Sequence, residues 1–496
     1  MATGIDNIEH VVVVMMENRS FDNLLGWLYG PGNLPKHNIP EQNPTTFDGL
    51  LPDTFSNEMG NGTPPVFASR PPKSWPANSN PSCVPTPDPH EEFDHIATQI
   101  FGTANPAAGQ EANMSGFLRD YASTNAGAAS ADQIMESFGP QEANVINDLA
   151  RNFAVCDAWF ASCPCQTWPN RGFVHTGSSD GHINNDNYEL YDIPTIFNVL
   201  EEQNITWNVF ADTTPPIPAL TLGQFLPRLL PYSAHFRNFS GFSSLCAAPA
   251  NANPASKLPA YSFIEPRFVT QLGLFKLDYP SDYHPPHNVC RGDTFLAQVY
   301  AAVRSSPYRD KILLVITFDE HGGCYDHVAP PTGAAPPMPY STSRDGTFHF
   351  DRFGVRVPAI VVSSYVRPGT VFRAPGQTPY DHTSILATLR DWKGLDQNGA
   401  QPFLPSPRIA AAPTLQPVLT QDDASKIVDW PEITARCSIT GDDESLATPL
   451  NDVQRSLIAS AIRKENPMAS ELGTAATAKQ LTNYQHQLLF LHPDAP

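Results

Sequence analysis

The sequence predicts an α/β fold built on a mostly parallel central sheet, and two observations support that prediction. Short, continuous apolar runs bounded by turn residues recur along the chain, and amphipathic segments of helical spacing alternate with them. Continuous apolar runs are typical of strands that are buried on both faces of a parallel sheet. Alternation of such strands with helices is the element order of a doubly wound α/β sandwich.

Five runs are predicted to be strands. The clearest cover residues 8–16, 312–318 and 357–362, and two weaker runs cover residues 206–210 and 261–264. The spacing of apolar residues in the intervals between these runs predicts helices, at residues 91–100, 145–153, 194–203, 294–304 and 384–392.

Proline separates the regular parts of the chain from the irregular ones. The chain has 51 prolines, which cluster in residues 31–90 and again in 213–260 and 329–350. Because proline has no backbone donor and fixes φ, residues 31–90 are expected to be neither sheet interior nor long helix. A loop of this length in a compact domain is usually functional, so we expect a lid or a cleft wall.

The strand pattern ceases after about residue 395, which predicts two regions of different character. The first, residues 1–395, holds all the predicted strands and is expected to be the principal domain. The second, residues 396–496, is expected to be a small, mainly helical C-terminal appendage, because residues 453–462 and 477–490 have amphipathic spacing.

Charge restricts the classes of partner. The 496 residues include 30 Lys+Arg and 50 Asp+Glu, a formal net charge of −20 at pH 7. Nucleic acid and anionic lipid both attract Lys/Arg clusters, so neither is expected, whereas transient contact with a zwitterionic membrane surface stays open. The longest apolar run, residues 11–16, is far below the roughly 20 residues of a spanning helix, and residues 1–9 lack a signal-peptide pattern. We therefore expect no transmembrane segment, and either a cytoplasmic protein or a secreted protein in its mature form.

Carboxylates follow three of the predicted strands. Glu17 and Asn18 come after residues 8–16, Asp319 and Glu320 after residues 312–318, and Glu265 after residues 261–264. The carboxyl ends of parallel strands share one sheet edge, where converging carboxylates repel unless a cation lies among them. Oxygen ligands suit Ca²⁺, Mg²⁺ or Mn²⁺, and nearby histidines keep Zn²⁺ possible. The simpler alternatives are helix caps, a solvated turn, and for Glu265 an ion pair with Arg267.

Thr167 lies just ahead of a predicted helix at residues 169–176, where Pro169 is tolerated in the first turn. Exposed amides and the positive end of the helix dipole favour an anion at such a position. Thr167 is then either a simple helix cap or a nucleophile activated by a metal, with Asn170 or Arg171 as contacts to phosphate oxygens.

Five of the 15 histidines stand in loops that are rich in proline or aspartate. His327 follows Asp326 and His382 follows Asp381, and a neighbouring carboxylate can fix an imidazole tautomer and raise its basicity. The other three are His90, His284 and His287. Most histidines in any chain are ordinary surface or core residues, so sequence position alone does not show whether these five histidines are functional.

Eight segments in consistent order between residues 8 and 392 resemble the phosphoesterase family, which unites bacterial phospholipases C, plant non-specific phospholipases C and certain acid phosphatases. The segments include ENRSFD, DPHEEFDHIATQIFG, TWPNRGFVHTGSS, SFIEPRF, HPPHNV, FDEHGGCYDHVAPP and YDHTSILATL. The resemblance implies an alkaline-phosphatase-like sandwich in residues 1–395, with a metal at the strand ends and a catalytic role for that domain. The C-terminal LNDVQRSLIASAI and LTNYQHQLLFL loosely resemble the helical tail of the plant enzymes.

The resemblance also implies roles for individual residues. One divalent ion would be held by Glu17, Asn18, Asp319, Glu320 and Thr167, with Thr167 also the nucleophile. Contacts to substrate and leaving group would come from His90, His287, Asp326 and His327, and less strongly from His284 and His382. Cys163-Pro164-Cys165 departs from the Pro-Gly-Pro usual beside the nucleophile, so the shape and disulfide state of that loop are open.

These roles predict a two-step phosphoryl transfer. The metal-activated Thr167 hydroxyl attacks phosphorus, His287 or His327 protonates the departing alcohol, and water hydrolyses the phosphothreonine. The expected activity is a phospholipase C that releases diacylglycerol and a phosphorylated head group from a glycerophospholipid. The alternatives are an acid phosphatase acting on monoesters and, more remotely, a catalytically silent metal-binding protein. A serine hydrolase is disfavoured because no G-x-S-x-G segment occurs.

Overall fold

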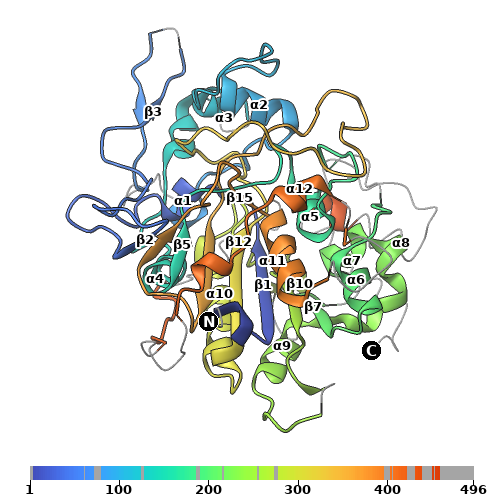
Figure 1. Ribbon diagram of the computed structural model, residues 1–496. Helices are drawn as coiled ribbons and strands as arrows, with labels where there is room; N and C mark the ends of the chain where they lie inside the picture. The colour runs from blue at the N-terminus through green and yellow to red at the C-terminus, as the bar shows by residue number, and fades with distance from the viewer. Residues whose placement is uncertain are drawn as a thin grey trace.

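A nine-stranded sheet forms the centre of the molecule in the computed structural model (Figure 1). The structure describes residues 4–60, 62–71, 80–124, 128–185, 190–214, 217–253, 256–272, 277–395, 403–404, 406–421, 430–437, 450–451 and 453–458. In spatial order, the strands are β2 (His37–Ile39), β14 (Thr370–Phe372), β5 (Ala154–Cys156), β13 (Ala359–Ser363), β12 (Ile312–Phe318), β1 (His10–Met16), β9 (Tyr261–Glu265), β7 (Trp207–Ala211) and β8 (Phe236–Asn238).

The five predicted strands are all present, and four of them lie side by side in parallel. β1 pairs with β12 on one side and β9 on the other, and β7 follows β9. Every residue of β1 and β12 is buried, as expected for strands covered on both faces. β13 differs from the expectation, because it runs antiparallel to both β12 and β5. The sheet is therefore mostly parallel, and the predicted α/β class is confirmed.

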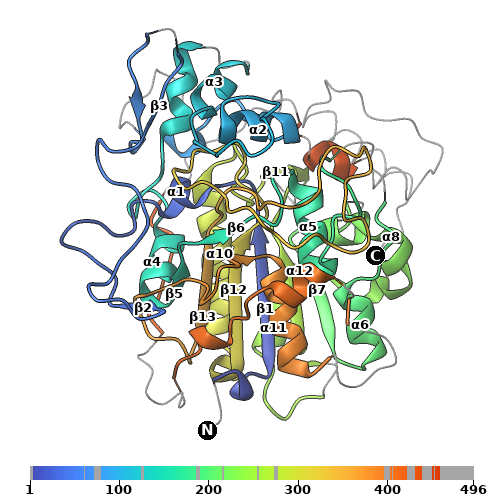
Figure 2. The same cartoon turned by 45° about the horizontal axis from the view of Figure 1, so that its top comes forward.

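Helices cover the sheet in two groups. α4 and α9 both contact α10, and α5, α6, α11 and α12 form a second connected group, with α11 and α12 in front of the sheet in Figure 2. The helices are α1 (Phe21–Leu25), α2 (Phe93–Phe101), α3 (Phe117–Ala122), α4 (Asn144–Asn152), α5 (Thr167–Thr176), α6 (Ile196–Glu202), α7 (Leu220–Gln224), α8 (Leu226–Leu229), α9 (Phe239–Cys246), α10 (Val289–Arg304), α11 (Thr383–Lys393) and α12 (Pro407–Ala411).

The helices α2 and α3 lie over the carboxyl end of the central strands, above β1 in Figure 1, whereas much of the preceding proline-rich segment runs along the β2 edge of the sheet. The segment adds only short pieces of strand: β2 on the sheet edge, and a separate pair, β3 (Ser56–Asn57) and β4 (Val66–Phe67). Edge positions tolerate neighbouring prolines. Two further pairs are β6 (Trp159–Phe160) with β15 (Tyr380–Asp381), and β10 (Gln271–Leu272) with β11 (Leu277–Asp278).

The C-terminal region is described only in part. Residues 453–458 are helical, within the predicted helix 453–462, and Val453 and Leu457 pack against Leu220 and Phe268. A disulfide joins Cys290 of α10 to Cys437, which the cysteine spacing did not predict. The predicted helix 477–490 lies outside the described residues, so the division at residue 395 stays a prediction. None of the described helices has the length and apolar character needed to cross a membrane.

Candidate active site

The ends of β1 and β12 bring three carboxylates and one amide together. Met16 pairs with Phe318 in parallel register, so Glu17 and Asn18 continue beside Asp319 and Glu320. The Asn18 backbone N–H donates to Asp319 Oδ1 at 3.0 Å, and Asn18 itself adopts a positive φ of 52°. All four side chains are fully buried. The predicted convergence at this sheet edge is therefore present in the structure.

Thr167 opens α5 directly opposite these residues. Its hydroxyl donates toward Glu17 Oε2 and Asn18 Oδ1, each at 3.3 Å. The preceding loop is held by Asn170, whose side-chain amide donates to the carbonyls of Cys163 and Cys165. Asn170 therefore holds the loop before Thr167 instead of facing the carboxylates. Cys163 and Cys165 are buried free thiols, which answers the question left open by their spacing.

Arg171 lies one turn after Thr167 on α5 and contacts the same carboxylate. Its Nε donates to Glu17 Oε1 at 2.8 Å and lies 3.9 Å from Asp319 Oδ2. Burial raises the pKa of Glu17 well above its usual value, and the Arg171 charge opposes that shift. The guanidinium packs over Phe268, and its NH1 group has no hydrogen-bond partner among the described residues.

Two carboxylate oxygens in this group are buried without any hydrogen-bond partner among the described residues: Asp319 Oδ2 and Glu320 Oε1. An unpaired buried charge costs several kcal/mol, so such atoms require a proton or a cation. Burial raises the pKa of both carboxyl groups, as expected for like charges held together out of water. Carboxylate, amide and hydroxyl oxygens around these atoms match the donor set of a hard divalent cation.

The loop before α10 adds Asp282, His284 and His287 to the same region. The Glu17 backbone N–H donates to the Asp282 carbonyl at 2.9 Å, and Asp282 Oδ1 lies 2.6 Å from His287 Nδ1. His287 Nε2 lies 3.2 Å from the side-chain amide of Gln454. His284 Nδ1 contacts the Pro285 carbonyl at 2.6 Å, so its Nε2 accepts from the Asn18 amide at 3.0 Å.

Glu91 is a site residue that the sequence reasoning missed. The Asn18 amide donates to Glu91 Oε1 at 2.6 Å, and burial raises the pKa of Glu91 well above its usual value. Asp88, from the same turn, has a buried Oδ1 that lies 3.5 Å from His284 Nδ1 and has no hydrogen-bond partner among the described residues. His90, which was selected instead, turns away and faces Asp120 at 4.0 Å. The acidic DPHEE segment is the sequence signal that could have indicated Glu91, but only its histidine was predicted to be a site residue.

Asp326 and His327 belong to a separate cluster around Arg356. Arg356 binds Asp326 Oδ1 at 2.9 Å and Asp22 Oδ1 at 3.0 Å, while His327 binds Asp22 through Nδ1 at 2.6 Å and Asp48 through Nε2 at 3.1 Å. Burial lowers the pKa of His327, but its hydrogen bonds to Asp22 and Asp48 outweigh that effect and raise it to about 9. No described contact links this cluster to Thr167.

His382 and Glu265 are occupied by backbone contacts. His382 Nε2 donates to the Asp319 carbonyl at 2.6 Å, and its Nδ1 accepts from the Trp159 indole at 3.3 Å. Burial lowers the pKa of His382 to about 4, so the ring is neutral. Its hydrogen bond to the Asp319 carbonyl stabilises the chain at the end of β12. Glu265 accepts the Leu220 and Thr221 backbone N–H groups at 2.8 Å, and Arg267 pairs with Asp212 instead, so the expected Glu265–Arg267 ion pair does not form.

Comparison with known proteins agrees with this geometry. The sequence profile of the Phosphoesterase family matches residues 8–396. Non-specific phospholipase C4 of Arabidopsis thaliana is 32% identical over 485 residues, covering 94% of this chain and 78% of that protein. Non-specific phospholipase C3 of the same plant is 34% identical, covering 77% of this chain and 69% of that protein. Non-hemolytic phospholipase C of Burkholderia pseudomallei is 25% identical, covering 77% and 54%.

Among solved structures, a protein in the alkaline phosphatase superfamily from Vibrio parahaemolyticus matches with a TM-score of 0.30 at 12% identity, covering 57% of this chain and 64% of that one. A likeness of this size supports no statement on function. The family assignment depends on the sequence matches, which span the central sheet and every residue of the buried acidic group. The chain belongs to the phosphoesterase family and is a phosphoric ester hydrolase.

Proposed function

We propose that this chain is a metal-dependent phospholipase C that cleaves glycerophospholipids through a phosphothreonine intermediate on Thr167. The observation that carries the proposal is the Thr167 hydroxyl, 3.3 Å from both Glu17 Oε2 and Asn18 Oδ1 and beside buried, unpartnered carboxylate oxygens. A helix that only needed a cap would not require these carboxylates. Relatives of 32–35% identity named non-specific phospholipase C support the choice of substrate class.

The residues that would hold one divalent ion are Glu17, Asn18, Asp319, Glu320 and Thr167. The unpartnered oxygens of Asp319 and Glu320 fit a cation, and the all-oxygen donor set suits Ca²⁺, Mg²⁺ or Mn²⁺ better than Zn²⁺. When bound, such an ion supplies Lewis-acid stabilisation of phosphate charge and lowers the pKa of a coordinated hydroxyl. Glu91 and His284 hold the Asn18 amide nitrogen, so its oxygen faces Thr167.

In the first step, the Thr167 oxygen attacks phosphorus in line with the departing alcohol. Glu17 Oε2 is the acceptor in reach of the hydroxyl proton. Arg171 keeps the Glu17 carboxylate in place and contributes positive charge beside the site. Water then hydrolyses the phosphothreonine and regenerates the hydroxyl.

His287 is the better of the two predicted general acids. Asp282 contacts Nδ1 at 2.6 Å, and Nε2, which also meets the Gln454 side-chain amide at 3.2 Å, is the nitrogen that we assign to protonation of the departing alcohol. Both ring nitrogens of His327 are already bound to carboxylates, so His327 and Asp326 act on the structure around Arg356. Replacing His287 by Ala tests this assignment, because substrates with a good leaving group need little protonation and should be least affected.

The proposed activity is tested with two chromogenic substrates and one lipid. We expect hydrolysis of p-nitrophenyl phosphorylcholine and release of diacylglycerol from phosphatidylcholine vesicles, both lost on chelation and in Thr167→Ala. Preferential hydrolysis of p-nitrophenyl phosphate, with no diacylglycerol released, would instead assign the chain as an acid phosphatase. Metal analysis of the purified protein identifies the ion.

We also propose the secreted form as the location, with transient contact to a zwitterionic membrane surface. The Cys290–Cys437 disulfide supports an oxidising compartment, since disulfides are rare in the cytosol. The net charge of −20 supports a neutral surface over an anionic one. Vesicle co-sedimentation, with phosphatidylcholine compared against phosphatidylserine, and mass spectrometry of the native disulfide test these two statements.

A further inference from the structure

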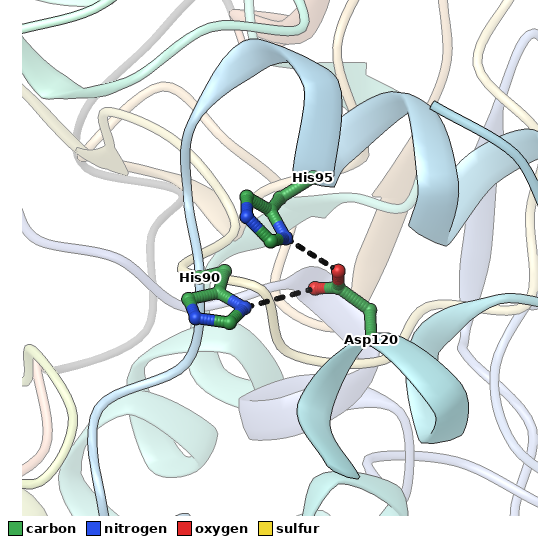
Figure 3. Close-up of side chains that lie close together, drawn as sticks. All are labelled: His90, His95 and Asp120. Carbon is green, nitrogen blue, oxygen red and sulfur yellow. Dashed lines mark hydrogen bonds and ion pairs between the residues drawn. The ribbon is translucent and has the colours of Figure 1, made fainter. Parts of the chain in front are cut away.

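A second group of potential metal ligands lies outside the active site, at the junction of α2 and α3. Figure 3 shows His90, His95 and Asp120 directed toward one another. His95 Nδ1 lies 2.7 Å from Asp120 Oδ1, and His90 Nδ1 lies 4.0 Å from Asp120 Oδ2. The two imidazole rings face each other with centroids 3.9 Å apart. This group, called the α2–α3 cluster below, uses none of the residues assigned to catalysis.

The surrounding structure fixes the cluster from two sides. Gln99, one turn after His95 on α2, donates through Nε2 to Asp120 Oδ2 at 2.8 Å and to the His90 carbonyl at 2.9 Å. The Gln99 side-chain amide therefore fixes the positions of both the Asp120 carboxylate and the His90 backbone. Asp120 is 3% exposed at its side chain, whereas His90 and His95 are 29% and 32% exposed. A buried anion lies under two accessible imidazoles.

We propose that the α2–α3 cluster is a binding site for a borderline divalent transition metal, with Zn²⁺ as the first choice. Two imidazole nitrogens and one carboxylate are the ligands that zinc prefers. The three ligand atoms all lie within 4.8 Å of one another, and the ligands of a tetrahedral zinc ion lie roughly 3.3 Å apart. Three protein ligands at a partly exposed position leave the fourth coordination position of the metal to solvent. We therefore expect the bound ion to exchange with ions in solution.

The local charge also favours a cation. Glu92 and Asp94 add negative charge beside His95, and the hydrogen bond to Asp120 raises the pKa of His95. A proton and a metal therefore compete for the same nitrogen, and metal binding releases a proton. Affinity should therefore rise as the pH is raised and His95 loses its proton. The site needs no charge from the active-site carboxylates, so it stands whether or not the proposed function holds.

The test titrates Co²⁺ into the metal-stripped full chain carrying Asp319→Asn, which disables the active-site ligands. We expect one equivalent to bind with the visible absorption of a tetrahedral Co²⁺ centre, displaced by Zn²⁺. His95→Ala and Asp120→Asn in the same background should weaken binding by roughly tenfold or more. His349→Ala, an exposed histidine elsewhere, is the matched control and should change nothing.

Circular dichroism and thermal melts of the stripped variants exclude misfolding as the cause of lost binding. His90→Ala is the second variant, because His90 lies in a loop and its replacement leaves α2 and α3 intact. Absence of a Co²⁺ spectrum in the Asp319→Asn protein, or a spectrum that survives His95→Ala and His90→Ala unchanged, would overturn the proposal.

Discussion

Two buried acidic groups follow β1 and β12, a few residues apart, and they differ in the hydrogen bonding of their carboxylates. Glu17, Asn18, Asp319 and Glu320 leave two buried carboxylate oxygens without a hydrogen-bond partner among the described residues. Further along the chain from each strand, Asp22 and Asp326 have hydrogen-bond partners for every carboxylate oxygen, supplied by side chains of Arg356 and His327 and by backbone N–H groups. Both groups are fully buried at their carboxylates.

This difference distinguishes a functional site from an ion cluster that only stabilises the structure. A buried ion cluster that is fully paired holds loops in place and has no bond left to offer. A buried carboxylate with a vacant lone pair is destabilising until something binds there, which is typical of functional sites. Sequence position does not distinguish the two groups, because both are acidic residues that follow the same strands. The following experiments test the distinction, from the largest expected effect to the smallest.

Replacing the proposed nucleophile, Thr167, should have the largest effect. We expect Thr167→Ala to lower kcat for p-nitrophenyl phosphorylcholine by about 10⁴-fold, because no other described hydroxyl lies against Glu17 and Asn18. Thr167→Ser is the matched control and should retain part of the activity. Near-normal turnover in Thr167→Ala would mean that the first group is not the reacting centre.

Asparagine at one acidic position in each group gives a direct comparison. Asp319→Asn should abolish metal binding and lower kcat by about 10³-fold, yet destabilise the chelated protein less than the paired change does, because Asp319 Oδ2 accepts no hydrogen bond and lies 3.9 Å from Arg171 Nε. Asp326→Asn should lower the free energy of unfolding by about 3 kcal/mol, because Arg356 loses a buried partner. Urea denaturation in chelator measures both variants. Equal destabilisation by the two changes would remove the distinction between the groups.

The paired group should also make stability depend on pH. The pKa of His327 is raised from 6.5 to about 9 in the folded protein, so its stabilising effect is complete below pH 6.5. That contribution, about 3 kcal/mol, should disappear as the pH rises through 9. The groups facing the ring are Asp22, Asp48, Asp326 and Arg356. His327→Gln should flatten the unfolding free energy between pH 6.5 and 10, and an unchanged slope would assign the effect to other groups.

The smallest expected effect concerns the orientation of one ligand. Glu91→Leu removes the acceptor that holds the Asn18 amide, so metal affinity should fall by roughly 10-fold, as is usual for residues that orient metal ligands. Glu58→Leu, the same change at an exposed glutamate that belongs to neither proposed metal site, is the control and should leave affinity unchanged. Calorimetric titration of the stripped protein with the identified ion measures both. Equal metal affinities in the two variants would show that the orientation of the Asn18 side chain does not depend on Glu91.

The fold and the centre of the site could be predicted because they depend on local patterns. Parallel strand ends share an edge, so Glu17 and Asp319 could be placed together from two apolar runs alone. The direction of β13 could not be predicted, since an apolar run reads the same in either direction. β5 and β14 were missed because three residues are too few for a periodicity.

The errors in the site come from distant partners. Arg356 follows Asp326 by 30 residues and Asp22 by 334, so no spacing rule indicates that it binds both. The choice between His90 and Glu91 depends on which way a loop side chain points, and that is set by Gln99 through the His90 carbonyl. The Cys290–Cys437 disulfide spans 147 residues and has no local signature.

The contacts that Gln454 makes with the catalytic domain have a practical consequence for truncated proteins. The family profile ends at residue 396, which invites expression of residues 1–396 as a minimal enzyme. Gln454 nevertheless touches the Phe268 carbonyl at 2.9 Å and His287 Nε2 at 3.2 Å, while Leu457 packs behind Leu220. Residues 453–458 thus cover the imidazole that we propose as the general acid, and we expect a protein cut at the profile boundary to expose His287 to bulk water.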